Sequence, residues 1–348
     1  MKKPAKLLAG VLAAAVLVSG TLAGCNGDTT ASGTTASGAA TGEKTYTIGI
    51  AQYMTHPAMD ASLKGFKEGL AAAGFEEGKN VTYDVQNAQG DQSTCTTVAN
   101  TMASKKPDLV LAIATPMALA VAKTITDIPV LITAVTDPAA SKLVQDNKKP
   151  GGNVTGTSDL TPVSEQIKLL KETKPDTQTV GIMYCSSEPN SKLQAEDAKK
   201  ACDENGLKYQ EFTVSAANEI TQVAQSMIGK VQAVYIPTDN LLASGMKVVT
   251  GVTTPAKLPV VVGESGMVGN GGLMTVGINY EELGKQTGAM AAKILKGESK
   301  PADMPIEYQE KYDVSYNSAV AKQLGVTLPD SILKEGTDVS AASSSSAA

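Results

Sequence analysis

The sequence predicts an α/β fold of two doubly wound lobes, each a parallel sheet with helices on both faces. Over residues 45–336, apolar runs of strand length alternate with segments of helical period, and this alternation is typical of parallel sheets. The elements form two sets of similar length, separated by a Lys-, Pro- and Gly-rich segment at 148–156. The chain of 348 residues is long enough for about two domains.

The first set contains four predicted strands and three predicted helices. The helix at 59–73 has the clearest pattern, because Leu63, Phe66 and Leu70 share one face and Gly74 follows as a helix-ending residue. The strands are predicted at 46–51, 80–85, 109–114 and 130–135. The helices are predicted at 59–73, 91–104 and 116–126.

The second set repeats this alternation and is followed by late elements. Its helices are predicted at 162–174, 190–205, 217–229 and 240–253, and its strands at 179–184, 208–214, 231–236 and 259–262. A strand at 272–278, a helix at 280–295, a break at 301–305 and an extended segment at 308–316 follow. We expect the late segments to return to the first lobe and then go back to the second across a hinge. The predicted first lobe is 45–153 with 280–300, the second is 154–279 with 301–336, and 337–348 is a disordered tail.

The N-terminus has the pattern of a secretory signal. Three lysines stand among the first six residues, an apolar run at 7–19 follows, and the string L-A-G-C occupies 22–25. The run is too short to span a membrane. The string resembles a bacterial lipobox, in which Cys25 is diacylated after removal of the signal peptide at 1–24; the alternative is an ordinary signal with an incidental Cys. Residues 25–44 are then a flexible Ser/Thr/Gly tether, and the protein is anchored by lipid to the outer face of the cytoplasmic membrane.

The composition excludes several classes of partner. The formal net charge is −5, all 30 basic residues are Lys, and Trp is absent. A nucleic-acid-binding protein is usually basic and uses Arg, so we expect no nucleic-acid partner. Without Arg, a bidentate clamp on a carboxylate or phosphate is also excluded.

The same residues argue against an enzyme, a cofactor or a metal site. The chain has a single His and no G-x-S-x-G string, so no nucleophile is paired with a base. No glycine-rich loop opens a helix to hold a dinucleotide. Cys95, Cys185 and Cys202 match no zinc spacing. We interpret them as small apolar core residues, and the sequence leaves open whether two of them form a disulfide.

Polar residues follow almost every predicted strand. Ligands of open α/β sheets bind beyond the carboxyl ends of the strands, so these clusters from the two lobes are expected to converge on one cleft. For a single residue, capping of the next helix is the alternative explanation. The predicted ligand-binding residues are Tyr53, Thr55, His56, Thr115, Thr136, Asp137, Ser158, Asp159, Thr161, Tyr184, Ser186, Ser187, Asn190, Asp239, Asn240 and Glu264.

The clusters suit both ends of an α-amino acid. Hydroxyls at helix N-termini attract a carboxylate without Arg; the candidates are Thr115, Thr136, Ser186 and Ser187. Carboxylates accept charge-assisted hydrogen bonds from an ammonium; the candidates are Asp137, Asp159 and Asp239. The candidates for aromatic contact with the ligand side chain are Tyr53 and Tyr184, with strand-end packing as the alternative. His56 is a candidate to hydrogen-bond to the ligand or to stack on it, with helix entry as the alternative.

Several strings together resemble the tryptophan/tyrosine-type substrate-binding family of ABC importers. They are Y-M-T-H at 53–56, N-A-Q-G-D at 87–91, I-A-T-P at 113–116, A-V-T-D-P at 134–138, N-V-T-G at 153–156, S-D-L-T-P at 158–162 and P-T-D-N at 237–240. The resemblance covers about 45–336 and implies the periplasmic-binding-protein class I fold and an aromatic amino-acid ligand. The residues that it carries over are Tyr53, Thr55, His56, Thr115, Thr136, Asp137, Ser158, Asp159, Asp239 and Asn240.

The predicted function is therefore that of a monomeric, lipid-anchored protein that binds a small zwitterion, most simply Trp, Tyr or Phe, and delivers it to an ABC permease. Closure of two lobes around a ligand is the usual behaviour of such proteins. The alternatives are an extracellular sensing domain for the same ligands and a binding protein for branched aliphatic amino acids.

Overall fold

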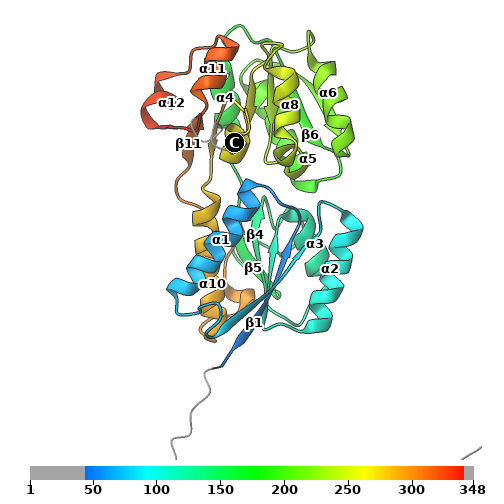
Figure 1. Cartoon of the computed structure of the whole chain (residues 1–348), viewed down its shortest axis with the longest axis vertical. Helices are drawn as coiled ribbons and strands as arrows, with labels where there is room; N and C mark the ends of the chain where they lie inside the picture. Colours follow the sequence, from blue (N-terminus) through cyan, green and yellow to red (C-terminus); the bar gives the residue numbers. More distant parts are fainter. Residues whose placement is uncertain (1–43, 341–348) are drawn as a thin grey trace, which may run out of the picture. The chain divides into compact units, whose positions relative to one another are not determined.

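The computed structural model describes residues 44–340, which contain two β-sheets flanked by helices (Figure 1). The first sheet has five parallel strands in the order β2-β1-β3-β4-β5. Its strands are β1 (Tyr46–Gln52), β2 (Val81–Asn87), β3 (Leu109–Ile113), β4 (Val130–Val135) and β5 (Val154–Ser158). The helices α1 and α10 cover one face, and α2 and α3 cover the other (Figure 1). These helices are α1 (Pro57–Ala72), α2 (Gln92–Lys105), α3 (Thr115–Thr124) and α10 (Tyr280–Leu295). We call this unit the first lobe.

The second sheet has seven strands in the order β12-β11-β10-β9-β8-β6-β7, and only β10 and β11 are antiparallel. Its strands are β6 (Thr179–Cys185), β7 (Lys208–Val214), β8 (Ala233–Ile236), β9 (Val260–Val262), β10 (Met274–Gly277), β11 (Asp313–Tyr316) and β12 (Thr337–Asp338). Its helices are α4 (Val163–Thr173), α5 (Pro189–Glu204), α6 (Ile220–Met227), α7 (Asn240–Ser244), α8 (Met246–Thr253), α9 (Ser265–Gly269), α11 (Ser318–Leu324) and α12 (Asp330–Glu335). We call this unit the second lobe.

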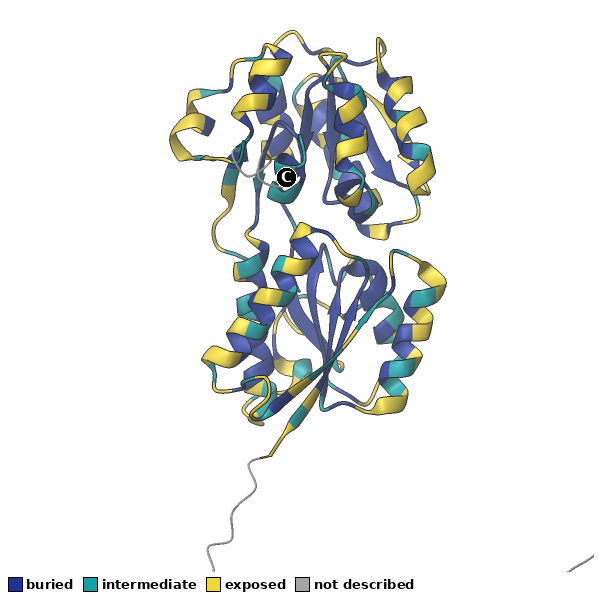
Figure 2. Cartoon of the chain, viewed as in Figure 1, coloured by how far each residue is buried: buried dark blue, intermediate teal, exposed yellow. Residues whose placement is uncertain are grey.

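Burial follows the sequence pattern. The central strands of both sheets are buried (Figure 2), as expected for parallel strands covered on two faces. The edge strand β7 is exposed at most of its positions. Local signals set the helix ends: Asp91 accepts a hydrogen bond of 2.7 Å from the Thr94 N–H to begin α2, and Pro57 is the first residue of α1.

The strand β5 differs from the sequence-based prediction, which places no strand at 154–158 and assigns these residues to the second lobe. It pairs with β4 in the first sheet, and a Cβ on Gly156 would lie 2.0 Å from the Ile132 carbonyl oxygen. Residues 301–307 also join the first lobe, because Met304 and Ile306 are buried in its core. The first lobe therefore extends to Ser158 and includes residues 301–307. These assignments depend on contacts between distant parts of the chain, which local strand patterns do not encode.

The structure differs locally from the prediction in four further places. The predicted helix at 240–253 is divided into α7 and α8 at Gly245, where a Cβ would lie 2.4 Å from the Ile220 Cδ1. The helix predicted at 217–229 begins as a short 3-10 turn, η1 (Ala217–Glu219). The short helices α9, α11 and α12 are absent from the sequence-based prediction, and so is β12, which pairs with β11 within the predicted tail. β11 occupies only 313–316 of the extended segment predicted at 308–316, and the other predicted strands and helices are present with ends shifted by at most two residues.

The helices α1 and α10 pack unusually closely. A Cβ on Gly65 would lie 1.9 Å from the Glu281 carbonyl oxygen, and a Cβ on Gly284 would lie 2.2 Å from the Ser62 carbonyl oxygen. Gly69 and Gly288 repeat this pattern one turn further along. The backbones therefore touch, which only glycine permits.

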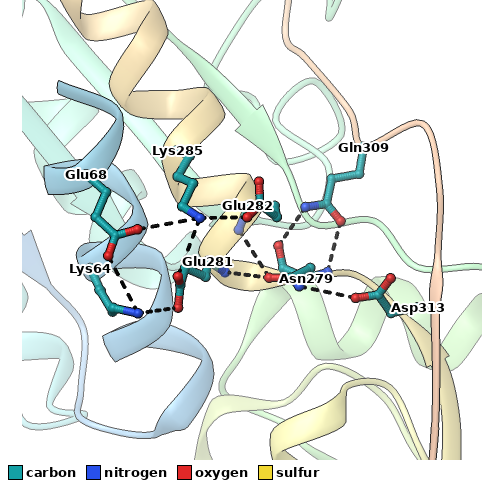
Figure 3. Close-up of polar contacts among 8 residues, drawn as sticks. All are labelled: Lys64, Glu68, Asn279, Glu281, Glu282, Lys285, Gln309 and Asp313. Atoms are coloured by element: carbon teal, nitrogen blue, oxygen red, sulfur yellow. Dashed lines mark hydrogen bonds and ion pairs between the residues drawn. The ribbon is translucent and has the colours of Figure 1, made fainter. Parts of the chain in front are cut away.

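Ion pairs run across the outer side of the same two helices (Figure 3). Lys64 lies 2.8 Å from Glu281, and Lys285 lies 2.7 Å from Glu282 and 3.5 Å from Glu68. These side chains are between 32% and 60% exposed, and exposed pairs contribute about 0–1 kcal/mol each. The glycine contact, rather than the ion pairs, is the main link between α1 and α10.

Three segments connect the lobes: 159–162 after β5, 278–279 before α10, and 308–312 before β11. Two of them are bound to each other (Figure 3). The Asn279 N–H donates to Gln309 Oε1 at 2.9 Å, and Gln309 Nε2 donates to the Asn279 carbonyl at 2.6 Å. Asn279 also caps α10 through its Oδ1.

Two findings concern the predicted chemistry of the chain. Cys95, Cys185 and Cys202 are buried and free, so they form no disulfide with one another. None of the helices within residues 44–340 combines the length and the apolar character needed to cross a membrane. The predicted signal peptide and Cys25 lie outside the described residues.

Candidate ligand-binding site

A small cavity of about 10 Å³ lies where residues of the two lobes meet. Its volume is close to the minimum of roughly 10–15 Å³ that holds one water molecule and far below the roughly 300–1,000 Å³ of small-molecule sites. An amino acid can therefore enter only if these side chains, or the lobes that carry them, move apart. The lining residues are His56, Met59, Ala134, Asp159, Asn190, Thr238, Asp239, Asn240, Ala243, Glu264 and Tyr280.

Four lining residues each carry a buried polar atom that has no hydrogen-bond partner within residues 44–340. These atoms are His56 Nδ1, Asp159 Oδ1, Asn190 Oδ1 and Glu264 Oε1. Each of the four residues is at most 6% exposed. A buried polar atom without a partner costs about 1–3 kcal/mol, so four of them around one cavity indicate a site made for a ligand.

Asp159 lies in the segment after β5 that connects the two lobes, and its side chain contacts α10. Its Oδ2 accepts a hydrogen bond of 2.9 Å from the Tyr280 hydroxyl. Burial raises the pKa of Asp159 to about 6, although the bond from Tyr280 opposes this rise. Its Oδ1 is the unpartnered oxygen, and the carboxylate is therefore suited to a cationic donor.

Glu264 presents a second carboxylate from the second lobe. It caps α9, where its Oε2 accepts from the Gly266 N–H at 2.6 Å, and its Oε1 has no partner. Burial raises the pKa of Glu264 to about 7, with the nearby charge of Asp159 adding to the rise. No lysine stands among the residues that line the cavity, so the two carboxylates have no protein cation there.

A further pair of buried acids, Glu188 and Asp239, lies at the start of α7. Asp239 accepts from the Leu242 N–H at 2.8 Å and the Cys185 N–H at 2.5 Å. Glu188 accepts from the Asn240 N–H at 3.1 Å and the Leu241 N–H at 3.0 Å. Burial, followed by the charge of Asp239, raises the pKa of Glu188 to about 8.

His56 connects the first lobe to this acidic corner. It precedes α1, and its Nε2 lies 3.2 Å from Asn240 Oδ1 in the second lobe. Burial lowers the pKa of His56, so the ring is neutral at pH 7. Asn190 belongs to the same corner, where its Nδ2 donates to the Thr238 carbonyl at 3.0 Å and its Oδ1 faces the cavity.

Hydroxyl groups lie at the ends of β3, β4 and β5. Thr115 Oγ1 accepts from the Thr136 N–H at 3.4 Å, and Ser158 donates to the Thr136 carbonyl at 2.6 Å. Ala114 and Ala134 next to them have positive φ values of 79° and 53°. Such strain in non-glycine residues clusters at functional sites.

One glutamine links the lobes at these hydroxyls. Gln194 of α5 donates from Nε2 to Thr136 Oγ1 at 3.4 Å, and its Oε1 accepts from Thr161 at the same distance. Thr115, Thr136, Ser158 and Thr161 thus lie near the cavity without lining it.

Other predicted site residues have contacts elsewhere. Asp137 accepts from the Ala139 and Ala140 N–H groups and from Asn147 within its own loop. The Tyr53 hydroxyl donates to the Gly90 carbonyl, and Thr55 is exposed beside Asn87. On the side of the second lobe, Tyr184 donates to Glu211, Ser186 donates to the Val214 carbonyl, and Ser187 contacts Cys185.

Several site residues are absent from the predicted set: Met59, Glu188, Gln194, Thr238 and Tyr280. Glu188 and Thr238 lie just after the strands β6 and β8, so the strand-end pattern that predicted the other site residues also applies to these two. Met59, Gln194 and Tyr280 lie one turn or more inside helices or at a helix start, where a sequence gives no sign of a neighbouring cleft.

The arrangement has the chemistry of a binding site for a positively charged donor group. Asp159 and Glu264 supply carboxylate oxygens, and Asn190 supplies an amide oxygen. Charge-assisted hydrogen bonds to such oxygens are the strong ones. Within the described part of the chain, no group of His, Cys, Asp and Glu side chains is arranged to hold a metal ion.

Comparison with known proteins assigns a family. Residues 47–340 match the model of the ABC transporter substrate binding protein family. The tyrosine-binding protein of Clostridioides difficile (strain R20291) is 36% identical over 324 residues, which cover 93% of each chain.

Two solved structures are similar over most of the chain. One is a domain from Streptococcus pneumonia in complex with L-Trp, with 40% identity, a TM-score of 0.82, and coverage of 85% of this chain and 99% of that one. The other is a ligand-free, open substrate-binding protein with adhesive properties from Clostridium difficile, with 44% identity, a TM-score of 0.66, and coverage of 84% and 98%. The predicted periplasmic-binding-protein class I fold is confirmed, and the matching family is one of binding proteins, as predicted, rather than enzymes. On these grounds the chain belongs to the ABC transporter substrate-binding protein family.

Proposed function

We propose that this protein is the extracytoplasmic binding lipoprotein of an ABC importer for aromatic amino acids. The observation that carries the proposal is the set of buried, unpartnered acceptor atoms that two lobes direct at one cavity. The family match and the two relatives associated with tyrosine and L-Trp support the ligand class.

The ammonium of the ligand binds to the acids of the cavity. An ammonium offers three donors, and Asp159 Oδ1, Glu264 Oε1 and Asn190 Oδ1 are acceptors without protein partners. The positive charge also compensates two carboxylates that are otherwise buried without a cation, a costly arrangement.

The carboxylate of the ligand binds at the hydroxyl groups beside α3. Thr115 is the first residue of that helix, and Thr136 lies next to it at the end of β4. The positive end of the helix dipole and two hydroxyl donors replace an Arg. Met59 of α1 lines the cavity and offers a soft apolar contact for an aromatic ring.

Binding requires the lobes to separate and close again around the ligand. The cavity is too small to admit an amino acid as it stands, and two-lobed binding proteins close by hinge motion. The three connecting segments at 159–162, 278–279 and 308–312 are the hinge in this proposal. The closed form then docks on a permease, while a lipid on Cys25 and the tether at 25–44 keep the domain near it.

Ligand analogues test the assignment of both polar ends. The full chain, stripped of bound ligand, is titrated by calorimetry with L-tyrosine, L-tryptophan and L-phenylalanine. Tyramine lacks the carboxylate, and 3-(4-hydroxyphenyl)propionate lacks the ammonium, so each removes one proposed contact while keeping the ring. We expect the amino acids to bind and both analogues to lose at least tenfold in affinity. If leucine, isoleucine or valine bound more tightly than the aromatic amino acids, the ligand class would be branched aliphatic instead. If 3-(4-hydroxyphenyl)propionate bound as tightly as L-tyrosine, the proposed ammonium site would be wrong.

A further inference from the structure

Glu188 is a buried acid that contacts the site without lining its cavity. It is 0% exposed and precedes α5, yet its oxygens face the start of α7. Its Oε2 accepts from the Asn240 N–H at 3.1 Å and from Asn240 Nδ2 at 2.5 Å, and its Oε1 accepts from the Leu241 N–H. Glu188 therefore contacts both the backbone and the side chain of Asn240.

These contacts fix the orientation of the Asn240 amide. Because Nδ2 donates to Glu188, the amide oxygen must point the other way, and Oδ1 lies 3.2 Å from His56 Nε2. The flipped amide would place its carbonyl oxygen against Glu188 Oε2, which accepts from the Asn240 backbone N–H in either orientation, so two acceptors would face each other. The acid thus determines which atom Asn240 presents to His56.

The orientation of Asn240 in turn determines the tautomer of His56. An amide oxygen only accepts, so the proton of the neutral imidazole must be on Nε2. The lowered pKa of His56, caused by burial, agrees with a neutral ring. Nδ1 then carries a lone pair, and it is the atom that has no partner within residues 44–340 at the edge of the cavity.

We propose that Glu188 is a positioning residue that acts through Asn240 to hold His56 as a hydrogen-bond acceptor for a donor group of the ligand. The inference rests on the proposed function for the identity of that donor, the ligand ammonium. With His56 in this tautomer, all four unpartnered atoms of the cavity are acceptors, because Asn190 Nδ2 already donates to the Thr238 carbonyl and leaves Oδ1 as its free atom. With Asp159 and Glu264 ionised the cavity holds acceptors only, and such a cavity favours an ammonium over a hydroxyl or carboxylate.

A simple capping role for Glu188 is the competing explanation, because it also accepts from two backbone N–H groups of α7. Capping affects stability, whereas positioning affects the protonation of one nitrogen. The test therefore needs a measurement on His56 itself. His56 is the single His of the chain, so the full protein labelled with ¹⁵N-histidine gives the signals of one imidazole.

The first measurement is the tautomer of His56 in the ligand-free wild type, read from the ¹⁵N chemical shifts of the ring. We expect a protonated Nε2 and an unprotonated Nδ1. Addition of L-tyrosine should shift the Nδ1 signal more than the Nε2 signal. A protonated Nδ1 in the free protein would overturn the proposal, as would an unchanged Nδ1 signal in protein shown by calorimetry to be saturated with the ligand.

The second measurement compares Glu188→Gln with Glu204→Gln; Glu188 precedes α5, and Glu204 is an exposed residue at the other end of that helix. A Gln at 188 can donate as well as accept, so Asn240 is free to flip and His56 becomes a mixture of tautomers. We expect that mixture together with a loss in L-tyrosine affinity of roughly 5- to 10-fold, the worth of one hydrogen bond. The control should keep one tautomer and the wild-type affinity. A folded Glu188→Gln protein with a single Nε2–H tautomer would leave Glu188 as a cap only.

The outcomes separate this inference from the proposed function. If the wild type binds no amino acid, the proposed function fails, while the tautomers of ligand-free wild type and Glu188→Gln still decide the role of Glu188. If Glu188→Gln does not fold, the wild-type tautomer and its response to L-tyrosine decide it.

Discussion

The Tyr280 hydroxyl donates a 2.9 Å hydrogen bond to Asp159 Oδ2, joining the first residue of α10 to the segment that follows β5. Both residues are buried and line the cavity. The bond leaves Asp159 Oδ1 without a partner within residues 44–340. The same contact therefore orients the carboxylate and keeps one oxygen available for a ligand.

Asp159→Asn should weaken amino-acid binding strongly, because it removes the charge that faces the ligand ammonium. A hydrogen bond to a charged group contributes about 1.5–3 kcal/mol, which corresponds to a loss of roughly 10- to 150-fold in Kd. Isothermal titration calorimetry with L-tyrosine and L-tryptophan measures it.

Asp137→Asn is the matched control for that change. Asp137 accepts hydrogen bonds within its own loop and does not line the cavity. We expect an affinity within about twofold of the wild type, with a small loss of stability. If Asp137→Asn weakened binding as much as Asp159→Asn does, the assignment of the ammonium site would be wrong.

Binding should strengthen as the pH rises from 5 to 8. Burial raises the pKa of Asp159 to about 6 and that of Glu264 to about 7, so both acids become ionised across this range. A ligand ammonium binds the ionised forms. Calorimetry at several pH values should show rising affinity and proton release on binding, and an affinity that is flat between pH 5 and 8 would contradict the role of these acids.

Stability of the ligand-free protein should change in the opposite direction. Because the folded-state pKa values of Asp159 and Glu264 are raised above their unfolded values near 4, the folded state binds more protons between about pH 4 and 7. The contribution of these acids to the free energy of unfolding then falls as the pH rises, by up to about 3 kcal/mol for Asp159 alone. Melting curves of wild type and Asp159→Asn should converge at low pH and diverge towards pH 8, with the variant more stable there.

Gly65→Ala should destabilise the protein, because the added Cβ would lie 1.9 Å from the Glu281 carbonyl oxygen. Overpacking of this kind costs about 1–3 kcal/mol or more. Gly251→Ala in α8 is the control, since a Cβ there meets nothing within 4 Å, and removing a helical glycine gains about 0.5–1 kcal/mol. Differential scanning calorimetry should show a lower Tm for the first variant and an equal or higher Tm for the second. Equal melting temperatures for Gly65→Ala and the wild type would mean that α1 and α10 separate easily.

Cys25→Ser should release the protein from the membrane, because the proposed lipid attaches to the Cys25 thiol. Fractionation of cells and labelling with radioactive palmitate measure the effect. Cys202→Ala removes a buried thiol instead and should leave both membrane association and labelling intact. Retention of labelled Cys25→Ser protein in the membrane fraction would exclude the lipobox.

The sequence predicted the α/β class, nearly all central strands and the strand-end location of several residues that line the candidate site. Residues such as Asp159, Asn190, Asp239 and Asn240 were identified because polar side chains follow apolar strands, and parallel strands bring those ends together. The same reasoning included Asp137 and Tyr184, whose side chains turn to their own loop or to β7. A strand-end pattern gives the location of a residue but not the direction of its side chain.

What the sequence determined by itself is the alternation of buried strands and helices, because period and capping are local properties of the chain. Only the tertiary structure decided that β5 pairs with β4, since its residues V-T-G-T-S carry little apolar signal and pairing depends on a distant partner. The tertiary structure also brought Tyr280 to Asp159 and Glu188 to Asn240, over separations of 121 and 52 residues. The unpartnered atoms of the cavity are those left over when these long-range hydrogen bonds have formed, and no local pattern records which atoms remain.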